Sequence, residues 1–198
     1  MDLGIAGKTA LVTASSQGMG RNIAFALAAE GANIVLYARS ADKLQAVKQE
    51  IEARHQVKVL AVAGDMANAA DCARLADALK RECNGPDIYV MNTGRAPNPI
   101  KDVLEEQDSA RWEQAHQTQL MGCIETTRAV VPTMLAKGWG RIVAVTSASV
   151  MQPMPHHSLS TVYRAGVHAY MKHLAREVGP AGITVNCVAP ALIESLHR

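Results

Sequence analysis

The sequence predicts an α/β fold, a doubly wound parallel sheet in three layers (α/β/α). Short runs of apolar and β-branched residues, five or six residues long, alternate with longer helical stretches along the chain. Such runs are typical of strands buried on both faces of a parallel sheet. Strands that alternate with helices of about ten residues or more form βαβ crossovers, and this alternation predicts the doubly wound arrangement.

The expected elements follow one another in a regular order. The first strand is expected at Thr9–Thr13 and the first helix at Gly18–Ala29, which Gly31 ends. Five further strands are expected at Asn33–Tyr37, Val57–Val62, Asp87–Met91, Arg141–Thr146 and Ile183–Val188. Four further helices are expected at Asp42–Arg54, from Asn68 or Asp71 to about Cys83, from Asp108 or Ser109 through Ala136, and at about Ser158–Val178. Asn and Asp are candidate caps because their side chains accept hydrogen bonds from free helix N–H groups.

Length and composition narrow the class of protein. The 198 residues are 48% hydrophobic and 19% charged with a net charge of +2, as expected for one globular domain, residues 1–198. Scattered Lys and Arg residues and short apolar runs make neither nucleic acid nor a membrane an expected partner. Four separated cysteines without metal-ligand spacing, and no signal-peptide pattern, favour reduced thiols, no metal site and a cytoplasmic location.

The turn after the first expected strand, residues 13–20 (TASSQGMG), carries the first functional pattern. In open α/β sheets, ligands bind beyond the carboxyl ends of the strands. Gly18 and Gly20 lack a Cβ, so the backbone can approach a pyrophosphate, and the following helix N-terminus offers free N–H groups. Two glycines alone often serve only tight packing. The position between the first strand and the first helix, however, predicts a phosphate or dinucleotide site.

Several motifs together resemble the short-chain dehydrogenase/reductase family. TASSQGMG resembles the family's TGxxxGxG turn, Asn92-Thr93-Gly94 its NAG motif, and Asp65 its adenine-contacting aspartate. Further matches are residues 140–143 (GRIV) with Thr146-Ser147 in the fifth strand, residues 174–177 (LARE) in the last helix, and Val185-Asn186 through Ala189-Pro190 around the sixth strand. The resemblance runs from about Gly7 to Glu194 and is nearest to the classical subgroup that includes 3-oxoacyl-(acyl-carrier-protein) reductases. It implies a Rossmann-type sheet that binds a nicotinamide dinucleotide.

The resemblance also implies which residues contact the cofactor. These are Thr13, Ser15, Ser16, Gln17, Gly18, Met19, Gly20, Arg39, Asp65, Met66, Asn92, Thr93, Gly94 and Pro190. One departure is Ala14, which stands where the family has its first motif glycine and has less backbone freedom. Because it adds only one methyl group, cofactor binding is expected to survive.

The end of the second strand distinguishes the 2′-hydroxyl of NAD(H) from the 2′-phosphate of NADP(H). NAD-preferring relatives carry an Asp there. Here Ala38 is followed by Arg39 and Ser40, so no carboxylate repels a phosphate and a guanidinium can pair with one. We therefore expect NADP(H) to be preferred over NAD(H). The alternative is that Arg39 is a solvated loop residue.

The match fails at the catalytic positions. The family uses Asn, Ser, Tyr and Lys, and only the Ser is in place, as Ser147. Gln119 stands at the Asn position, Ser160 at the Tyr position and Arg164 at the Lys position. The family's Tyr exchanges a proton with the substrate oxygen, and its Lys lowers the pKa of that Tyr. Ser160 is a poorer donor because an aliphatic hydroxyl is a much weaker acid, whereas Arg164 keeps the charge and can contact a ribose or a phosphate.

Tyr163 is a second candidate for the proton donor. It follows Ser160 by three residues, which is ~4.5 Å along a helix and about 60° around it, so its phenol has the site within reach. The alternative is that Tyr163 packs against a neighbouring helix or subunit. His156 and His157 can relay protons near neutral pH, with solvated loop histidines as the alternative.

Two functions are compatible with these motifs. The first is an NADP(H)-dependent oxidoreductase that reduces a carbonyl or oxidises an alcohol, with Ser147 orienting the oxygen and Tyr163 or water supplying the proton. The resemblance adds a 3-oxoacyl thioester as a possible kind of substrate. The second is a catalytically impaired protein that senses NADP(H) or scaffolds a partner. Ser147 and the charge of Arg164 favour the enzyme.

The resemblance also bears on assembly and on the end of the chain. Relatives associate through two long helices, here Ser109–Ala136 and Ser158–Val178, which predicts a homodimer or homotetramer. In the family, a substrate lid and a seventh strand follow the sixth strand, whereas this sequence ends at Arg198. The resemblance therefore predicts either a truncated or partly recorded protein, or a cofactor-binding core that lacks a conventional substrate lid.

Overall fold

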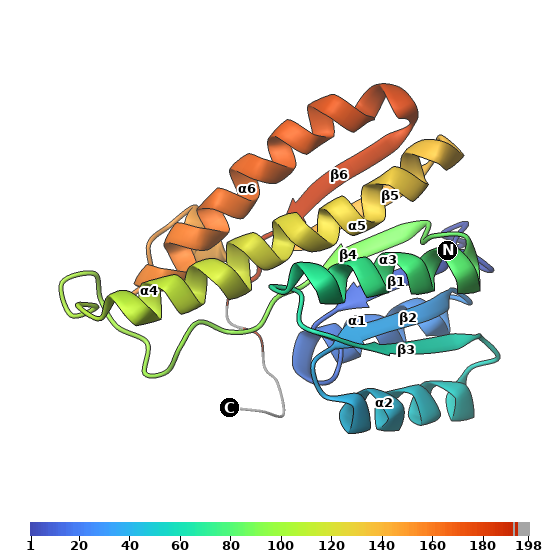
Figure 1. Cartoon of the computed structure of the whole chain (residues 1–198), viewed down its shortest axis with the longest axis horizontal. Coiled ribbons are helices and arrows are strands. Elements are labelled where there is room, and N and C mark those ends of the chain that lie inside the picture. Colours follow the sequence, from blue (N-terminus) through green and yellow to red (C-terminus); the bar gives the residue numbers. More distant parts are fainter. Residues whose placement is uncertain (192, 194–198) are drawn as a thin grey trace.

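The computed structural model describes residues 1–191 and 193, so the far end of the family resemblance, at Glu194, lies outside the described residues. Its six strands form one sheet in the order β3-β2-β1-β4-β5-β6, and neighbouring strands pair in parallel (Figure 1). The order reverses between β1 and β4 at the centre, as in a Rossmann sheet. The predicted fold class is confirmed.

The strands lie within two residues of their predicted bounds. They are β1 (Thr9–Thr13), β2 (Asn33–Ala38), β3 (Val59–Ala63), β4 (Ile88–Met91), β5 (Gly140–Val145) and β6 (Ile183–Val188). Leu11, Leu36 and Ile142 are fully buried in the strand centres. Burial on both faces explains why these runs are apolar without alternation.

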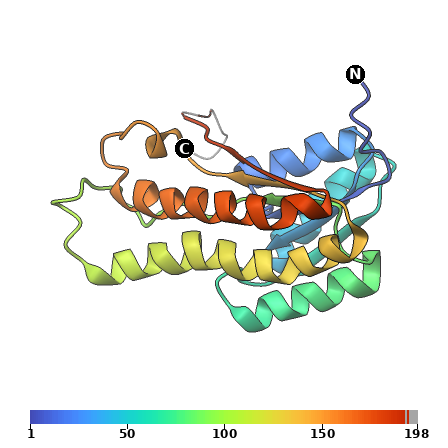
Figure 2. The same ribbon diagram turned by 90° about the horizontal axis from the view of Figure 1, so that it is seen from above.

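Helices cover both faces of the sheet, which gives the three layers. α1 (Gly18–Ala29) and α2 (Ala41–Arg54) pack on one face with the core side chains Ala10, Val12 and Leu36. α3 (Ala69–Cys83), α5 (Gly122–Lys137) and α6 (Ser158–Val178) pack on the other with Leu11, Tyr89 and Ile142. Figure 2 shows α1 on the opposite side of the sheet from α3 and α5.

The long helix predicted from residue 109 differs from the expectation in its middle. α4 (Ser109–Ala115) leads into a π-helical segment, η1 (His116–Met121), before α5 begins. Wider π turns are frequent at functional sites. Asp108 caps α4 and Asn68 caps α3, each by accepting hydrogen bonds from backbone N–H groups, and this settles which residues begin these helices.

Two short 3₁₀ turns complete the described elements. η2 (Ala148–Val150) follows β5, and η3 (Gly179–Ala181) joins α6 to β6. In the part of the chain that the structure describes, no helix is both long and apolar enough to cross a membrane.

Candidate functional site

The carboxyl ends of β1 and β4 meet at the centre of the sheet, and Thr13 joins them. Its hydroxyl donates to the Asn92 carbonyl at 2.7 Å, and its Oγ1 accepts from the Asn92 backbone N–H at 2.9 Å. Ser15 joins the same turn to β2, because its Oγ accepts from the Tyr37 backbone N–H at 3.0 Å. Thr13 and Ser15 are fully buried, so both side chains fix the shape of the turn.

The turn uses glycine at two positions for two different structural reasons. Gly18 has φ +57°, and beyond its chain neighbours no atom of the described part of the chain lies within 4 Å of a Cβ position there. At Gly20, by contrast, a Cβ would lie 2.4 Å from the Ala14 carbonyl oxygen and 2.9 Å from Asn92 Nδ2. Ala14 itself has φ +48°, a left-handed conformation that glycine adopts more readily. The turn is therefore tightly packed at Gly20 and open above Gly18.

The N-terminus of α1 faces the same edge of the sheet. Gln17 is its N-cap residue, and the Gln17 side chain makes no capping hydrogen bond. The first N–H groups of the helix are therefore not capped by a side chain, and such groups bind phosphate. Ser16 and Met19 are half-buried beside them.

Two cationic side chains lie beside this turn on the β2 side. Arg39 follows β2 and is exposed, and its side chain has no hydrogen bond or ion pair with the described residues. Lys43, in the first turn of α2, donates from Nζ to Gln17 Oε1 at 3.2 Å. Lys43 is not among the residues that the sequence predicted to contact the cofactor.

The ends of β3 and β4 continue the same edge. Asp65 accepts from the Ala67 N–H at 3.0 Å through Oδ1, and Met66 is buried behind it. Asn92 and Thr93 are also buried, and Thr93 Oγ1 has no hydrogen-bond partner among the residues that the structure describes. Apart from its own chain neighbours, no described residue has an atom within 4 Å of a Cβ position at Gly94. The expected cofactor positions thus gather at one edge of the sheet, with open space at Gly18 and Gly94.

Ser147 follows β5 at the same edge. Its Oγ lies 2.9 Å from Ser149 Oγ and accepts from the Ser149 backbone N–H at 3.2 Å. Pro190, after β6, accepts from the Ala148 N–H at 2.9 Å. These bonds give Ser147 a defined place between the β5 end and the β6 end.

The Arg164 side chain contacts the backbone directly before Ser147. One guanidinium nitrogen donates to the carbonyl oxygens of Val145 at 2.9 Å and Thr146 at 3.0 Å. Its Nε is buried without a hydrogen-bond partner in the described part of the chain, and burial lowers the pKa of Arg164 to about 10. Arg164 thus holds the end of β5, which the sequence had not suggested.

A histidine that the sequence did not single out joins the same point. His168 Nε2 lies 2.6 Å from Thr146 Oγ1, and the Thr146 hydroxyl donates to the Val188 carbonyl at 3.1 Å. A carbonyl only accepts, so the Thr146 oxygen accepts from a protonated Nε2. Arg164 and His168 are four residues apart on α6, which could have suggested that both reach one point.

The Tyr163 side chain, on α6, packs against the α4–η1 region. Its ring makes an edge contact with Trp112, centroids 6.1 Å apart, and a tilted contact with His116 at 5.7 Å, both from the α4–η1 region. Burial, and to a lesser extent Glu113, raises the pKa of Tyr163. These contacts favour packing over proton donation, although the proton-donor role of Tyr163 stays an untested prediction.

Gln119 lies within the π segment η1 and is fully buried. Neither its Nε2 nor its Oε1 has a hydrogen-bond partner among the described residues. A buried amide without partners costs free energy, so this position is under a constraint other than packing alone.

A small cavity lies between the loop after β4 and the start of α6. Its lining includes Pro97, Ile100, Lys101, His157 and Ser160. Ser160 is thus accessible from this cavity, whereas Arg164, one turn further along α6, is buried. The structure separates the two residues that stand at the family's Tyr and Lys positions.

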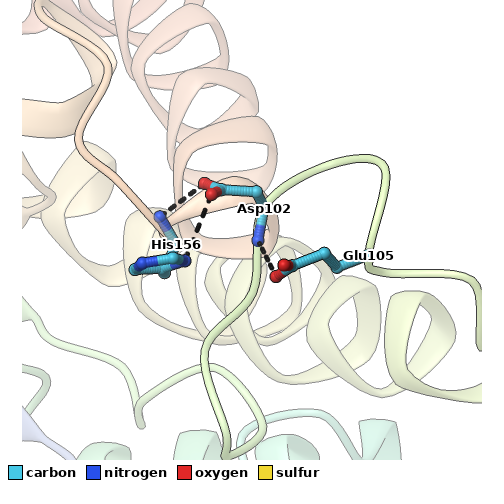
Figure 3. Close-up of side chains that lie close together, drawn as sticks. All are labelled: Asp102, Glu105 and His156. Carbon is cyan, nitrogen blue, oxygen red and sulfur yellow. Dashed lines mark hydrogen bonds and ion pairs between the residues drawn. The ribbon is translucent and has the colours of Figure 1, made fainter.

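Two surface loops that border this cavity are joined to each other, and Figure 3 shows the side chains that join them. The His156 backbone N–H donates to Asp102 Oδ1 at 2.6 Å, and His156 Nδ1 lies 3.2 Å from Asp102 Oδ2. Glu105 Oε2 accepts from the Asp102 N–H at 3.3 Å. Ser158 adds a bond from its Oγ to the Lys101 carbonyl at 2.8 Å. Asp102 and His156 are 54 positions apart in the sequence, which explains why sequence spacing gave no sign of this contact.

Arg111 organises the loop after β4. Its guanidinium pairs with both oxygens of the buried Glu106 carboxylate and donates to the carbonyls of Pro97, Asn98 and Pro99. The hydrogen bonds from Arg111 lower the pKa of Glu106. One side chain therefore determines the path of a loop that lines the cavity.

We expect Arg111→Met to lower the Tm at pH 7 by several degrees, since it leaves the buried Glu106 carboxylate unpaired. A carboxyl with a lowered folded-state pKa stabilises the fold above its unfolded pKa, about 4.3, and loses that contribution as the pH falls. The Tm difference from the wild type should therefore shrink in acid. Thermal melting measured from neutral to acidic pH checks this. Arg128→Met, in an exposed pair with Glu125, is the control; equal effects of the two changes would contradict the prediction.

Comparison with known proteins agrees with this geometry. The family model described as short chain dehydrogenase matches residues 8–198. A 3-oxoacyl-(acyl-carrier-protein) reductase of Staphylococcus epidermidis is 34% identical over 189 residues, covering 95% of this chain and 76% of the relative.

Solved structures superpose closely. L-sorbose reductase from Gluconobacter frateurii, solved with NADPH and L-sorbose, has a TM-score of 0.93 and 34% identity, covering 99% of this chain and 73% of that one. An NADPH-bound short chain oxidoreductase from Pseudomonas aeruginosa, described as containing an atypical catalytic center, has a TM-score of 0.89 and 28% identity, covering 96% and 73%.

Proposed function

The chain belongs to the short-chain dehydrogenase family, and from this premise we propose that it is an NADP(H)-dependent oxidoreductase that interconverts a carbonyl compound and an alcohol. One observation carries the proposal. The open Gly-rich turn, the Asn92–Gly94 segment and Ser147 all lie at the carboxyl edge of one doubly wound sheet, where such sheets bind ligands.

The residues at this edge fit a dinucleotide. Open space above Gly18 and Gly94 and the N-terminus of α1 suit a pyrophosphate. Asp65 and Met66 would flank the adenine, and Pro190 would lie at the nicotinamide end. The bound nicotinamide supplies or accepts the hydride. Ser147 would donate a hydrogen bond to the substrate oxygen.

The preference for NADP(H) rests on Arg39. Its guanidinium is exposed and has no partner in the described part of the chain, so it can pair with a 2′-phosphate without losing another interaction. NADPH-bound structures among the family relatives support this choice.

Arg39→Asp should weaken NADPH binding roughly ten- to hundredfold, as expected for the loss of a charge-assisted hydrogen bond of about 1.5–3 kcal/mol. The new carboxylate can also bind the ribose hydroxyls, so NADH should bind more tightly than to the wild type. Fluorescence titration with both cofactors measures the two affinities. Arg81→Asp makes the same charge change at the exposed end of α3 and should alter neither. If both affinities stayed the same in Arg39→Asp, Arg39 would not read the phosphate.

The relatives offer candidate substrate classes, which can be tested directly. A 3-oxoacyl thioester is one candidate, because a relative at 34% identity is a 3-oxoacyl-(acyl-carrier-protein) reductase. NADPH fluorescence on binding, followed by NADPH oxidation with ketones, aldehydes and 3-oxoacyl thioesters, tests the proposal. Binding without oxidation would favour a cofactor sensor or scaffold instead.

The same proposal includes a homodimer or homotetramer through the α4–α5 region and α6. Exposed apolar side chains on these helices, Leu135 and Val162, support it. Light scattering during gel filtration measures the mass. A cytoplasmic location is part of the proposal, and the free thiols of the four cysteines support it.

A further inference from the structure

The proposed reduction needs a proton for the substrate oxygen, and three candidates are poorly suited to give it. The Ser160 hydroxyl is too weak an acid. Arg164 is buried and donates to two backbone carbonyls. Tyr163 packs against Trp112 and His116.

We infer that His157 is the residue that gives this proton, and takes it back in alcohol oxidation; the inference rests on the proposed function. His157 immediately precedes α6, and its carbonyl already accepts the helical hydrogen bond from the Thr161 N–H at 2.8 Å. It therefore lies about one helical turn before Ser160, which stands at the family's Tyr position. Both side chains line the cavity between α6 and the loop after β4.

The ring of His157 is oriented for proton transfer. Its Nδ1 lies 2.7 Å from the Pro155 carbonyl oxygen, and because a carbonyl only accepts, Nδ1 carries a hydrogen. In the neutral ring the lone pair is therefore on Nε2, and no described residue occupies that nitrogen. A backbone carbonyl that fixes the tautomer and orientation of a histidine is a recurrent feature of histidines in catalysis.

The charged neighbours of His157 leave the ring available. Two carboxylates lie close by: Glu106 is paired with Arg111, and Asp102 is bound by His156. Lys101 also lines the cavity. His157 and His156 are thus adjacent in sequence but differ in role, because His156 is exposed and bound to a surface carboxylate.

The step balances with His157 as the acid. The carbonyl carbon gains the hydride, and the carbonyl oxygen takes the proton from Nε2–H of the imidazolium. The neutral ring keeps its Nδ1–H on the Pro155 carbonyl and regains a proton from solvent. In alcohol oxidation, neutral Nε2 accepts the hydroxyl proton as the hydride leaves the carbon. Imidazole suits this exchange because the same ring nitrogen can donate a proton and take it back.

The test compares His157→Gln and His157→Asn with His156→Gln and Tyr163→Phe. His157→Asn can keep an N–H for the Pro155 carbonyl but has no Nε2, which guards against a merely structural loss; melting curves verify folding. Both His157 variants should bind NADPH as the wild type does and lose about 10²–10⁴-fold in kcat. His156→Gln and Tyr163→Phe should keep both NADPH binding and kcat near the wild-type values.

A second readout does not depend on turnover. The His157 ring signals, identified by their absence from the spectrum of His157→Gln, should shift when the alcohol product is added to the protein with NADP⁺. Three results would overturn the inference but leave the proposed function standing. They are a wild-type kcat in His157→Asn, a loss of turnover in Tyr163→Phe, and His157 ring signals that do not shift. If the wild-type protein oxidised NADPH with none of the ketones, aldehydes and 3-oxoacyl thioesters, the proposed function would be overturned, and the inference with it.

Discussion

Replacing Ser147 by alanine is expected to lower kcat by about 10²–10³-fold, the usual effect of removing one hydrogen-bond donor from a developing oxyanion. The Ser147 hydroxyl is positioned by Ser149, whose backbone N–H donates to it at 3.2 Å and whose Oγ lies 2.9 Å away. It lies at the carboxyl end of β5, apart from the turn that would hold the pyrophosphate. NADPH affinity should therefore stay unchanged. Steady-state kinetics and fluorescence titration on the same samples measure both quantities.

Ser149→Ala is the matched control for this experiment. It removes a hydroxyl of the same size two residues away but leaves the Ser147 hydroxyl and the Ser149 backbone N–H in place. A much smaller loss of kcat is expected from Ser149→Ala. If the two variants lost activity equally, the hydroxyls would act through local structure, and Ser147 would have no separate role at the substrate oxygen.

Much of the fold could be predicted because its signals are local. β6 (Ile183–Val188) and α6 (Ser158–Val178) lie at their predicted bounds, since a buried strand and a long amphipathic helix are each determined by their own apolar pattern. The π segment at His116–Met121 has no such signal. At the start of α5, a Cβ on Gly122 would lie 2.8 Å from Met66, so close packing between distant segments affects this part of the helix.

The candidate site likewise has residues whose place could be predicted from the sequence and residues whose place could not. Thr13, Asn92 and Ser147 could be predicted to gather, because each follows a parallel strand and those strand ends share one edge. The bond of His157 to the Pro155 carbonyl could not, because it depends on an irregular loop. The burial of Arg164 was hidden for another reason. A sequence shows that a charge is kept at a position but not whether the charge meets a ligand or, as here, the backbone.

Gly20→Ala is expected to destabilise the protein by about 1–3 kcal/mol, as inserted atoms do in a packed core. The new Cβ would lie 2.4 Å from the Ala14 carbonyl oxygen, a backbone atom that cannot rotate away, and 2.9 Å from Asn92 Nδ2. For a chain of this size, each kcal/mol lowers the Tm by roughly 2–4 °C. Because the turn itself must shift, NADPH binding should weaken roughly tenfold or more, as when a charge-assisted hydrogen bond is lost.

The sign of this effect makes the experiment decisive. Gly20 lies within α1, and helix propensity alone predicts that alanine stabilises such a position by about 1 kcal/mol. Gly166→Ala in α6 is the matched control, because a Cβ there would meet only the Leu120 side chain at 3.4 Å, an ordinary contact distance. Melting curves should therefore move in opposite directions, down for Gly20→Ala and level or up for Gly166→Ala. A rise for both would mean that the turn yields to a methyl group, and that Gly20 is not needed to hold the Gly-rich turn against Asn92.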